Sequence, residues 1–157
     1  MVLKPTDFLK VKECAAKCKP LEDYDFHIYK ILLKYFENTC FIEEHNGEVA
    51  GFIISFMSQT SKDTCFLWQI GVDPAFQGKG IATDLLKKCE KQLKQLDCKR
   101  IELTIDPENI ASQKLFEKNG YKNASSNEGE TIEVKGKVSV KDYYRPGRHF
   151  MLYEKYI

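Results

Sequence analysis

The sequence predicts an α/β (α+β) fold, in which a central, mostly antiparallel sheet of six to seven strands is flanked by about four helices. Segments whose apolar residues recur every three to four positions indicate the helices. The 157 residues suffice to bury a core without disulfides or metals, so we expect one domain over residues 1–157. Short apolar runs of strand-like composition indicate the longer strands at 39–43, 49–57, 65–72, 100–105, 131–140 and 149–156.

The N-terminal part predicts a short strand and two helices. Val2 and Leu3 suit the strand, and Thr6 or Asp7 suits the cap of a helix that runs to about Cys18. A second helix is predicted from about Asp23 to Phe36, where apolar residues recur at helical spacing.

A hairpin and a strand-turn-helix unit follow. Strands 39–43 and 49–57 are joined by a turn that contains Asn46-Gly47, a strong hairpin signal. Strand 65–72 leads through a glycine-rich turn into an amphipathic helix from Ile81 to near Asp97.

The C-terminal part alternates short strands with one helix. Strand 100–105 places Glu102 on the face opposite Ile101 and Leu103. A short helix after Pro107 is expected to end at Asn119-Gly120 in a left-handed cap. The remaining strands are predicted near Tyr121, at 131–140 and at 149–156, with a mobile loop at 125–129.

Composition limits the partners. Lys plus Arg number 24 against 23 for Asp plus Glu, so the net charge of +1 favours neither nucleic acid nor an acidic membrane. The sequence lacks a signal-peptide core and an apolar run of about 18 residues, so we expect a cytoplasmic protein. The six cysteines fall mostly in apolar runs without zinc-finger spacing, and the three histidines lie far apart. We therefore expect reduced, buried thiols and no metal.

The turn between strand 65–72 and the next helix suits an anion. The first amides of a helix lack intrahelical partners and carry partial positive charge, while Gly78 and Gly80 permit positive φ and close approach to the backbone. The pattern is not a P-loop, because no Gly-Lys-Ser/Thr follows four spacer residues, and it is not a dinucleotide Gly-x-Gly-x-x-Gly fingerprint, because Thr occupies position 83. A tight turn without any ligand is the alternative.

A second motif identifies a family resemblance. Gln77, Gly80 and Ala82 fit the Gln/Arg-x-x-Gly-x-Gly/Ala signature of the GNAT acyltransferases, and the segment from Asn109 to Tyr121 resembles their Asn-x-x-Ala-x-x-Leu-Tyr-x-Lys-x-Gly-Phe signature. The resemblance implies a GNAT-like single domain with a mixed sheet, and acetyl-CoA as the acetyl donor.

Within that superfamily the N-terminal half is similar to diaminobutyrate acetyltransferases of ectoine synthesis. The likeness runs through 20–29, 36–40, 47–52 and 68–74. Those enzymes commonly carry Pro-Leu-Asp-x-Asn-Ser, whereas this sequence has Glu22, Tyr24 and Asp25 at the differing positions.

The resemblance implies that acetyl-CoA lies along strand 65–72 and against the helix that follows. The backbone of Ile70 and Val72 would bond the pantetheine arm, and the glycine turn would hold the pyrophosphate. The predicted cofactor-binding residues are Ile70, Val72, Gln77, Gly78, Lys79, Gly80, Ile81, Ala82, Thr83, Asn109 and Phe116.

Glu102 is the predicted catalytic residue, as a base or as the organiser of a water, because an alkyl ammonium with a pKa near ~10.4 must lose a proton before it attacks. A solvated or ion-paired strand carboxylate is the alternative. The family's usual tyrosine acid corresponds to Phe116, which cannot donate a proton and is expected to pack. Tyr143 or Tyr144 is then the candidate acid, or water and local dipoles assist the thiolate.

For the amine acceptor, Glu22, Asp25 and Trp68 are the predicted binding residues, since carboxylates attract an ammonium and an indole ring can stack on it. Asp23, Tyr29 and His149 are further candidates. A core tryptophan and a solvated acidic helix start are the alternatives.

The leading hypothesis is N-acetylation of a small amine, such as a diamino acid or polyamine, in a ternary complex. The alternatives are acetylation of a protein lysine or N-terminus, and a non-catalytic acetyl-CoA-binding module. The family also suggests a possible homodimer.

Overall fold

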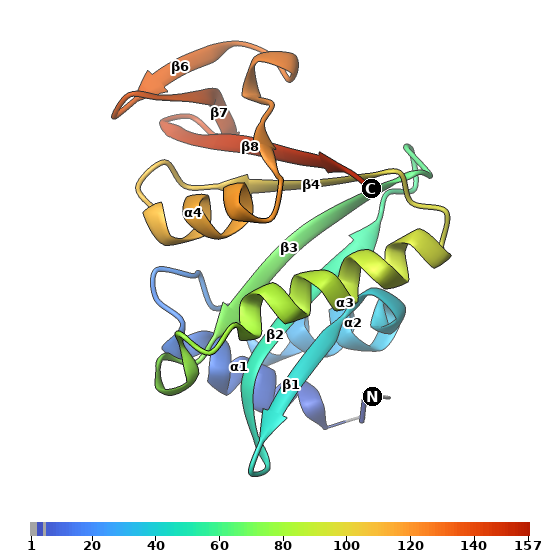
Figure 1. Cartoon of the computed structure of the whole chain (residues 1–157). Helices are drawn as coiled ribbons and strands as arrows, with labels where there is room; N and C mark the ends of the chain where they lie inside the picture. The colour runs from blue at the N-terminus through green and yellow to red at the C-terminus, as the bar shows by residue number, and fades with distance from the viewer. Residues whose placement is uncertain (1–2, 5) are drawn as a thin grey trace. The chain divides into compact units, whose positions relative to one another are not determined.

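The computed structural model describes residues 3–4 and 6–157, and contains four α-helices and eight strands within that part of the chain (Figure 1). The chain divides into two compact units, one up to Cys98 and one from Lys99 onward, and each is described by itself. The single-domain organisation stays a prediction. Val2 lies outside the described residues, and Leu3 belongs to no strand.

The first unit begins with two helices, α1 (Asp7–Lys17) and α2 (Phe26–Tyr35). The second starts later than the sequence predicts, because the Asp25 carboxylate accepts a hydrogen bond from the Phe26 amide at 2.8 Å and caps the helix there. Thr6 occupies the cap position of α1 without a side-chain bond. The acidic run 22–25 therefore lies outside the helix.

A three-stranded antiparallel sheet follows, with β1 (Phe41–His45), β2 (Glu48–Met57) and β3 (Thr64–Val72). Asn46 and Gly47 adopt φ values of 53° and 83°, as a tight two-residue hairpin turn requires. The predicted hairpin is confirmed.

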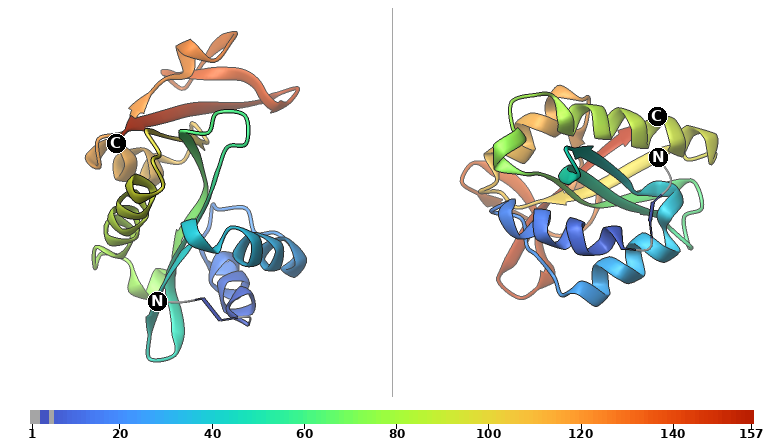
Figure 2. Two further views of the ribbon diagram at one scale, coloured as in Figure 1. Left: turned by 90° about the vertical axis from the view of Figure 1, so that its right-hand side faces the viewer. Right: turned by 90° about the horizontal axis from the view of Figure 1, so that it is seen from below.

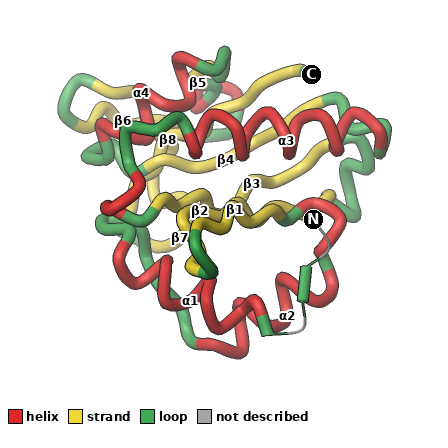
Figure 3. The backbone as a smooth tube through the Cα atoms, turned by 60° about the horizontal axis from the view of Figure 1, so that its bottom comes forward, coloured by secondary structure: helices red, strands yellow, loops and turns green. Residues whose placement is uncertain are grey.

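Helices cover both faces of this sheet (Figures 2 and 3). The third helix, α3 (Ile81–Gln95), lies on one face, and α1 and α2 lie on the other. A Cβ at Gly51 would stand 2.8 Å from Cγ2 of Ile81, so only glycine lets α3 pack this closely on β2. On the opposite face Phe52 and Ile54 join a core with Tyr29 of α2.

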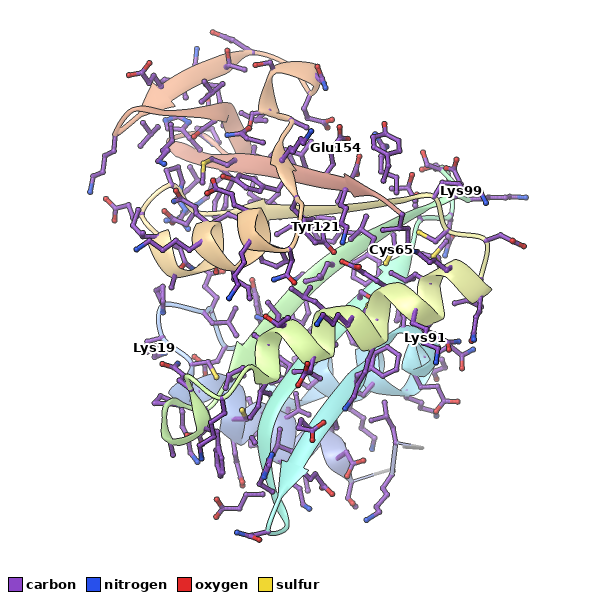
Figure 4. The ribbon with its side chains drawn as sticks, viewed as in Figure 1. Lys19, Cys65, Lys91, Lys99, Tyr121 and Glu154 are labelled. Carbon is purple, nitrogen blue, oxygen red and sulfur yellow. The ribbon has the colours of Figure 1, made fainter. Side chains whose placement is uncertain are left out.

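The six cysteines are buried and free. Burial is the main cause that raises the pKa of Cys40, Cys65 and Cys89 to about 12, so these thiols stay protonated at neutral pH. Figure 4 labels Cys65, on β3. The prediction of buried thiols is confirmed.

The second unit is an antiparallel arrangement around its last strand. β4 (Arg100–Ile105) and β5 (Lys122–Asn123) pair with β8 (Arg148–Tyr156), as does β7 (Lys137–Arg145), and β6 (Thr131–Val134) pairs with β7. Helix α4 (Ile110–Lys118) is tied to β8, because the hydroxyl of Tyr153 donates to Glu117 at 2.8 Å.

The predicted single strand over 131–140 is wrong. Lys135 and Gly136 adopt φ values of 49° and 75°, and this turn divides the segment into β6 and β7. Within the segment 125–129, Ser125 begins a short 3₁₀ turn, is buried, and accepts a hydrogen bond from the Leu152 amide at 3.0 Å. The mobility of this segment stays a prediction.

None of the helices in the described chain combines the length and apolar character needed to span a bilayer.

Candidate active site

The turn that opens α3 has the geometry of an anion cradle. Gly78 and Gly80 have φ values of 78° and 82°, and Gly80 is the N-terminal cap of the helix. The first intrahelical hydrogen bond runs from the Asp84 amide to the Gly80 carbonyl at 3.0 Å. The amides of residues 81–83 therefore precede the helical ladder and are suited to a phosphate.

The space over this turn is open. A Cβ built at Gly78 or Gly80 would meet no heavy atom within 4 Å, so a pyrophosphate has room to approach the backbone. The Lys79 ammonium lies 5.0 Å from the centre of the Phe76 ring, and the Gln77 side chain donates to the Val72 carbonyl at 3.3 Å. The residues present fit a bound coenzyme A pyrophosphate.

A β-bulge shapes the predicted acceptor region. Ile54 pairs with Gln69 and Ser55 pairs with Leu67, which leaves Trp68 as the extra residue of β3. Consecutive strand residues normally point to opposite faces. Because of the bulge, Trp68 and Gln69 both contact the α2 side, where Tyr29 lies.

This bulge gathers an aromatic and acidic cluster within the first unit. The Trp68 ring lies 5.1 Å from Tyr24 and 6.0 Å from Tyr29, centre to centre. The Tyr24 hydroxyl donates to the Glu22 carboxylate at 2.9 Å. Gln69 donates to the Glu22 carbonyl at 2.6 Å and accepts from the Tyr29 hydroxyl at 3.1 Å. We name Glu22, Tyr24, Tyr29, Trp68 and Gln69 the Trp68 cluster.

Sequence reasoning missed Tyr24 and Gln69 as members of this cluster. The signal for Gln69 was a single amide in an otherwise apolar strand, a residue that needs partners once it is buried. Tyr24 gave no comparable signal, since its contacts depend on the bulge.

The other two acidic candidates of this region are engaged elsewhere. Asp25 caps α2 and its side chain is 73% exposed. Lys12 and Lys19 bond the Asp23 carboxylate at 2.6 and 3.3 Å, and these bonds hold its pKa below the usual range. Of the acidic run, only Glu22 joins the Trp68 cluster.

In the second unit, Glu102 lies on the predicted face of β4, opposite the buried Ile101 and Leu103. Its carboxylate bonds the Arg100 guanidinium at 2.7 Å, and Glu154 is its cross-strand neighbour. Burial raises the pKa of Glu102, the Arg100 charge opposes that rise, and Glu128 and Glu154 add to it.

The tyrosine candidates lie near Glu102. Burial raises the pKa of Tyr143 to about 12, with smaller contributions from Tyr144, Glu128 and Glu102. The Tyr144 hydroxyl lies 2.7 Å from the Thr104 hydroxyl, on the Glu102 face of β4. The raised pKa of Tyr143 keeps its phenol protonated at neutral pH. His149 instead accepts from the Asp142 amide at 3.0 Å.

The last two predicted residues lie in and before α4. The Asn109 side chain accepts from the Ser112 amide at 3.1 Å and caps the helix. Phe116 is only 2% exposed and packs edge-on against Tyr121, 5.1 Å between ring centres. Both contacts are structural, and their roles toward acetyl-CoA stay predictions. No three metal-binding side chains gather in the part of the chain that the structure describes.

The comparison with protein families matches residues 8–121 to the model described as "Acetyltransferase (GNAT) family". The chain belongs to this acetyltransferase family. The matched segment includes the Gly78–Gly80 turn, the Trp68 cluster and α4, so the motifs that suggested the resemblance lie inside the family match.

Curated relatives of this GNAT chain are named L-2,4-diaminobutyric acid acetyltransferase. The protein of Shouchella clausii is 37% identical over 103 residues, which is 66% of this chain and 58% of that protein. The protein of Vibrio parahaemolyticus is 31% identical over 135 residues, 83% of this chain and 75% of that protein. The GNAT chain thus spans 58% of one relative's length and 75% of the other's.

Solved structures share the fold. A diaminobutyrate acetyltransferase from Paenibacillus lautus, in complex with L-2,4-diaminobutyric acid and coenzyme A, aligns with a TM-score of 0.77 and 24% identity over 98% of this chain and 91% of its own. Ard1 from Thermoplasma volcanium aligns with a TM-score of 0.80 and 15% identity over 100% and 95%. The predicted GNAT-like fold is confirmed.

Proposed function

We propose that this GNAT chain transfers the acetyl group of acetyl-CoA to a primary amine of a small molecule, and that the acceptor is a diamino acid. The observation that carries the proposal is the likeness to L-2,4-diaminobutyric acid acetyltransferases, at 31% identity over 83% of the chain. The family match over residues 8–121 covers both the glycine turn and the Trp68 cluster.

The donor binds along β3 and the N-terminus of α3. The open space over Gly78 and Gly80 supports a pyrophosphate on the amides of residues 81–83, with Lys79 nearby. The backbone of Ile70 and Val72 bonds the pantetheine arm. Acetyl-CoA is a substrate here, and the transfer requires no metal.

The amine attacks the thioester carbon directly within a ternary complex, where positioning is worth up to about 7 to 11 kcal/mol. The amine first gives a proton to Glu102, directly or through a water, because an ammonium with a pKa near ~10.4 has no free electron pair. The nitrogen–carbon bond forms and the nitrogen releases its second proton to solvent, while the carbon–sulfur bond breaks and the thiolate takes a proton. Tyr143, protonated at neutral pH, is the proposed donor of that proton.

The acceptor's ammonium groups are recognised in part by Glu22 and Trp68. The Tyr24 hydroxyl orients the Glu22 carboxylate at 2.9 Å, and the indole ring offers a face for a cation. Asp25 is the third proposed binding residue, and its carboxylate also caps α2.

An amine panel tests the proposal. Acetyl-CoA consumption is measured with 2,4-diaminobutyrate, lysine, β-lysine, spermidine and an unstructured peptide that carries both a free N-terminus and a lysine. Turnover of small diamines, with 2,4-diaminobutyrate preferred, is expected. Turnover of the peptide alone would make the chain a protein acetyltransferase, and binding without any turnover would make it a binding module.

The proposal includes a cytoplasmic location and a homodimer. Six buried free thiols suit a reducing compartment.

Sedimentation equilibrium tests the homodimer: a mass twice the 18.2 kDa of the chain is expected at micromolar concentration. A monomer at that concentration would contradict it.

A further inference from the structure

We propose that Arg100 is a positioning residue for Glu102: its guanidinium bonds one carboxylate oxygen of Glu102, reaches the cross-strand Glu154, and leaves the second oxygen of Glu102 available for a proton. This inference rests on the proposed role of Glu102 as the base. Arg100 belongs to neither of the two family signatures. Its contacts with Glu102 on β4 and Glu154 on β8 suggest the role.

The geometry is that of a fork between two carboxylates. Nη2 of Arg100 lies 2.7 Å from Oε1 of Glu102, and Nη1 lies 3.5 Å from Oε2 of Glu154. Glu102 and Glu154 are direct register partners of β4 and β8, so both carboxylates stand on the same face of the sheet. Without a cation between them, two adjacent carboxylates would repel each other.

The three side chains are partly shielded from water. The exposed fraction is 31% for Arg100, 22% for Glu102 and 18% for Glu154. An ion pair at this depth is screened less than one on the open surface. Figure 4 labels Glu154 on β8 and Tyr121 just beyond α4.

One oxygen of Glu102 remains for chemistry. Within the described part of the chain, Oε1 of Glu102 holds the 2.7 Å contact with Arg100, and no other side chain forms a hydrogen bond or an ion pair with this carboxylate. A carboxylate held at one oxygen keeps its orientation and still accepts a proton at the other. Arginine suits this task better than lysine, because its planar fork reaches two acceptors in a fixed geometry.

Other titratable groups act on the same carboxylate, and they set the direction of the pH effects. Glu128, Glu154 and Tyr143 lie close enough to interact with Glu102 through their charges. Tyr156 is the register partner of Arg100, and Lys122 of β5 is the register partner of Glu154 on its other side. Arg100 is the group in this set that lowers the pKa of Glu102.

The first test measures the Glu102 carboxyl itself. In full-length protein labelled with ¹³C at glutamate side chains, Arg100→Gln is expected to raise the pKa of Glu102 by about 1 to 3 units, since a neighbouring opposite charge has an effect of that size. Glu154→Gln is expected to lower it, because a like charge disappears. Lys88→Gln and Glu43→Gln, which break a 2.6 Å ion pair between α3 and β1 in the first unit, are matched controls expected to leave it unchanged.

The second test measures turnover. The acid limb of the kcat/KM profile is expected to follow the shift in each variant, with the KM for acetyl-CoA unchanged. Arg100→Lys is expected to restore the limb but to leave kcat several-fold below the unsubstituted protein, because an ammonium keeps the charge and loses the fork. In a Glu102→Gln background, Arg100→Gln is expected to reduce kcat little further, because the effects of substituting two residues that act together are not additive.

The outcomes separate the two proposals. An unchanged Glu102 titration in Arg100→Gln, or a full additional loss of kcat in the double variant, would overturn the role of Arg100. A shifted titration with an unshifted rate profile would instead show that Glu102 is not the base, and the proposed mechanism would fail while the influence of Arg100 on the carboxyl stands.

Discussion

The position of Glu102 within its strand was enough to predict the face of the sheet on which the side chain lies. The alternation of β4 predicts its face, and the structure confirms that Ile101 and Leu103 are buried on the other. The predicted alternative, an ion-paired carboxylate, is also observed in the bond to Arg100. An ion pair that uses one oxygen is compatible with a base, so the catalytic role needs a kinetic test.

Glu102→Gln is expected to lower kcat by roughly 10²-fold or more, because the loss of a general base removes about 10² to 10⁴ of the rate. Affinity for acetyl-CoA, measured by calorimetry, is expected to persist. Glu43→Gln is the matched control. Each of the two carboxylates lies on a strand and forms a short ion pair, and the exposed fraction of the side chain is 22% for Glu102 and 32% for Glu43. Near-normal turnover of Glu102→Gln would remove the catalytic assignment.

Glu22→Gln is expected to raise the KM for the amine about tenfold or more, with a smaller effect on kcat, since a charge-assisted hydrogen bond contributes about 1.5 to 3 kcal/mol. Tyr24→Phe removes the hydroxyl that orients this carboxylate and is expected to shift KM in the same direction by less. Steady-state kinetics with the best amine of the panel measures both. An unchanged amine KM in Glu22→Gln would place recognition elsewhere.

At the scale of elements, the turn into α3 and the bulge in β3 shape the two regions that we propose for the substrates. The turn offers backbone amides and open space, whereas the bulge turns Trp68 toward Tyr24 and Tyr29. The first feature follows from local sequence, because glycine alone accepts these φ values without strain. The second depends on pairing between strands.

Gly80→Glu is expected to abolish acetyl-CoA binding in calorimetry, because a carboxylate side chain would occupy the space of the pyrophosphate and repel it. The variant is expected to fold, since a Cβ there meets no atom and the left-handed conformation costs about 1 to 2 kcal/mol. Gly47→Glu carries the same penalty in the β1–β2 turn, at a φ of 83° and also in open space. Its affinity for acetyl-CoA is expected to be retained; a loss there as large as in Gly80→Glu would point to strain rather than to the site.

At the scale of the whole molecule, the division into two compact units raises the question of whether they unfold in one cooperative transition. The single-domain prediction implies one unfolding transition for the chain. Trp68, the one tryptophan of the sequence, reports on the first unit by fluorescence, and the exchange of β4 amides reports on the second. The free energies of unfolding from the two probes in urea are expected to coincide; two separate midpoints would establish two domains.

The sequence by itself determined the family, the hairpin, the glycine turn that opens α3 and the face on which Glu102 lies. These follow from local chemistry: glycine dihedrals, the Asn46-Gly47 turn, and the two-residue and 3.6-residue periods. The structure corrected two local predictions, the start of α2 at the Asp25 cap and the single strand 131–140, and only the tertiary structure decided the contacts of Trp68 and Arg100. A bulge and a cross-strand partner each depend on which strands meet in space, and periodicity carries no information about that.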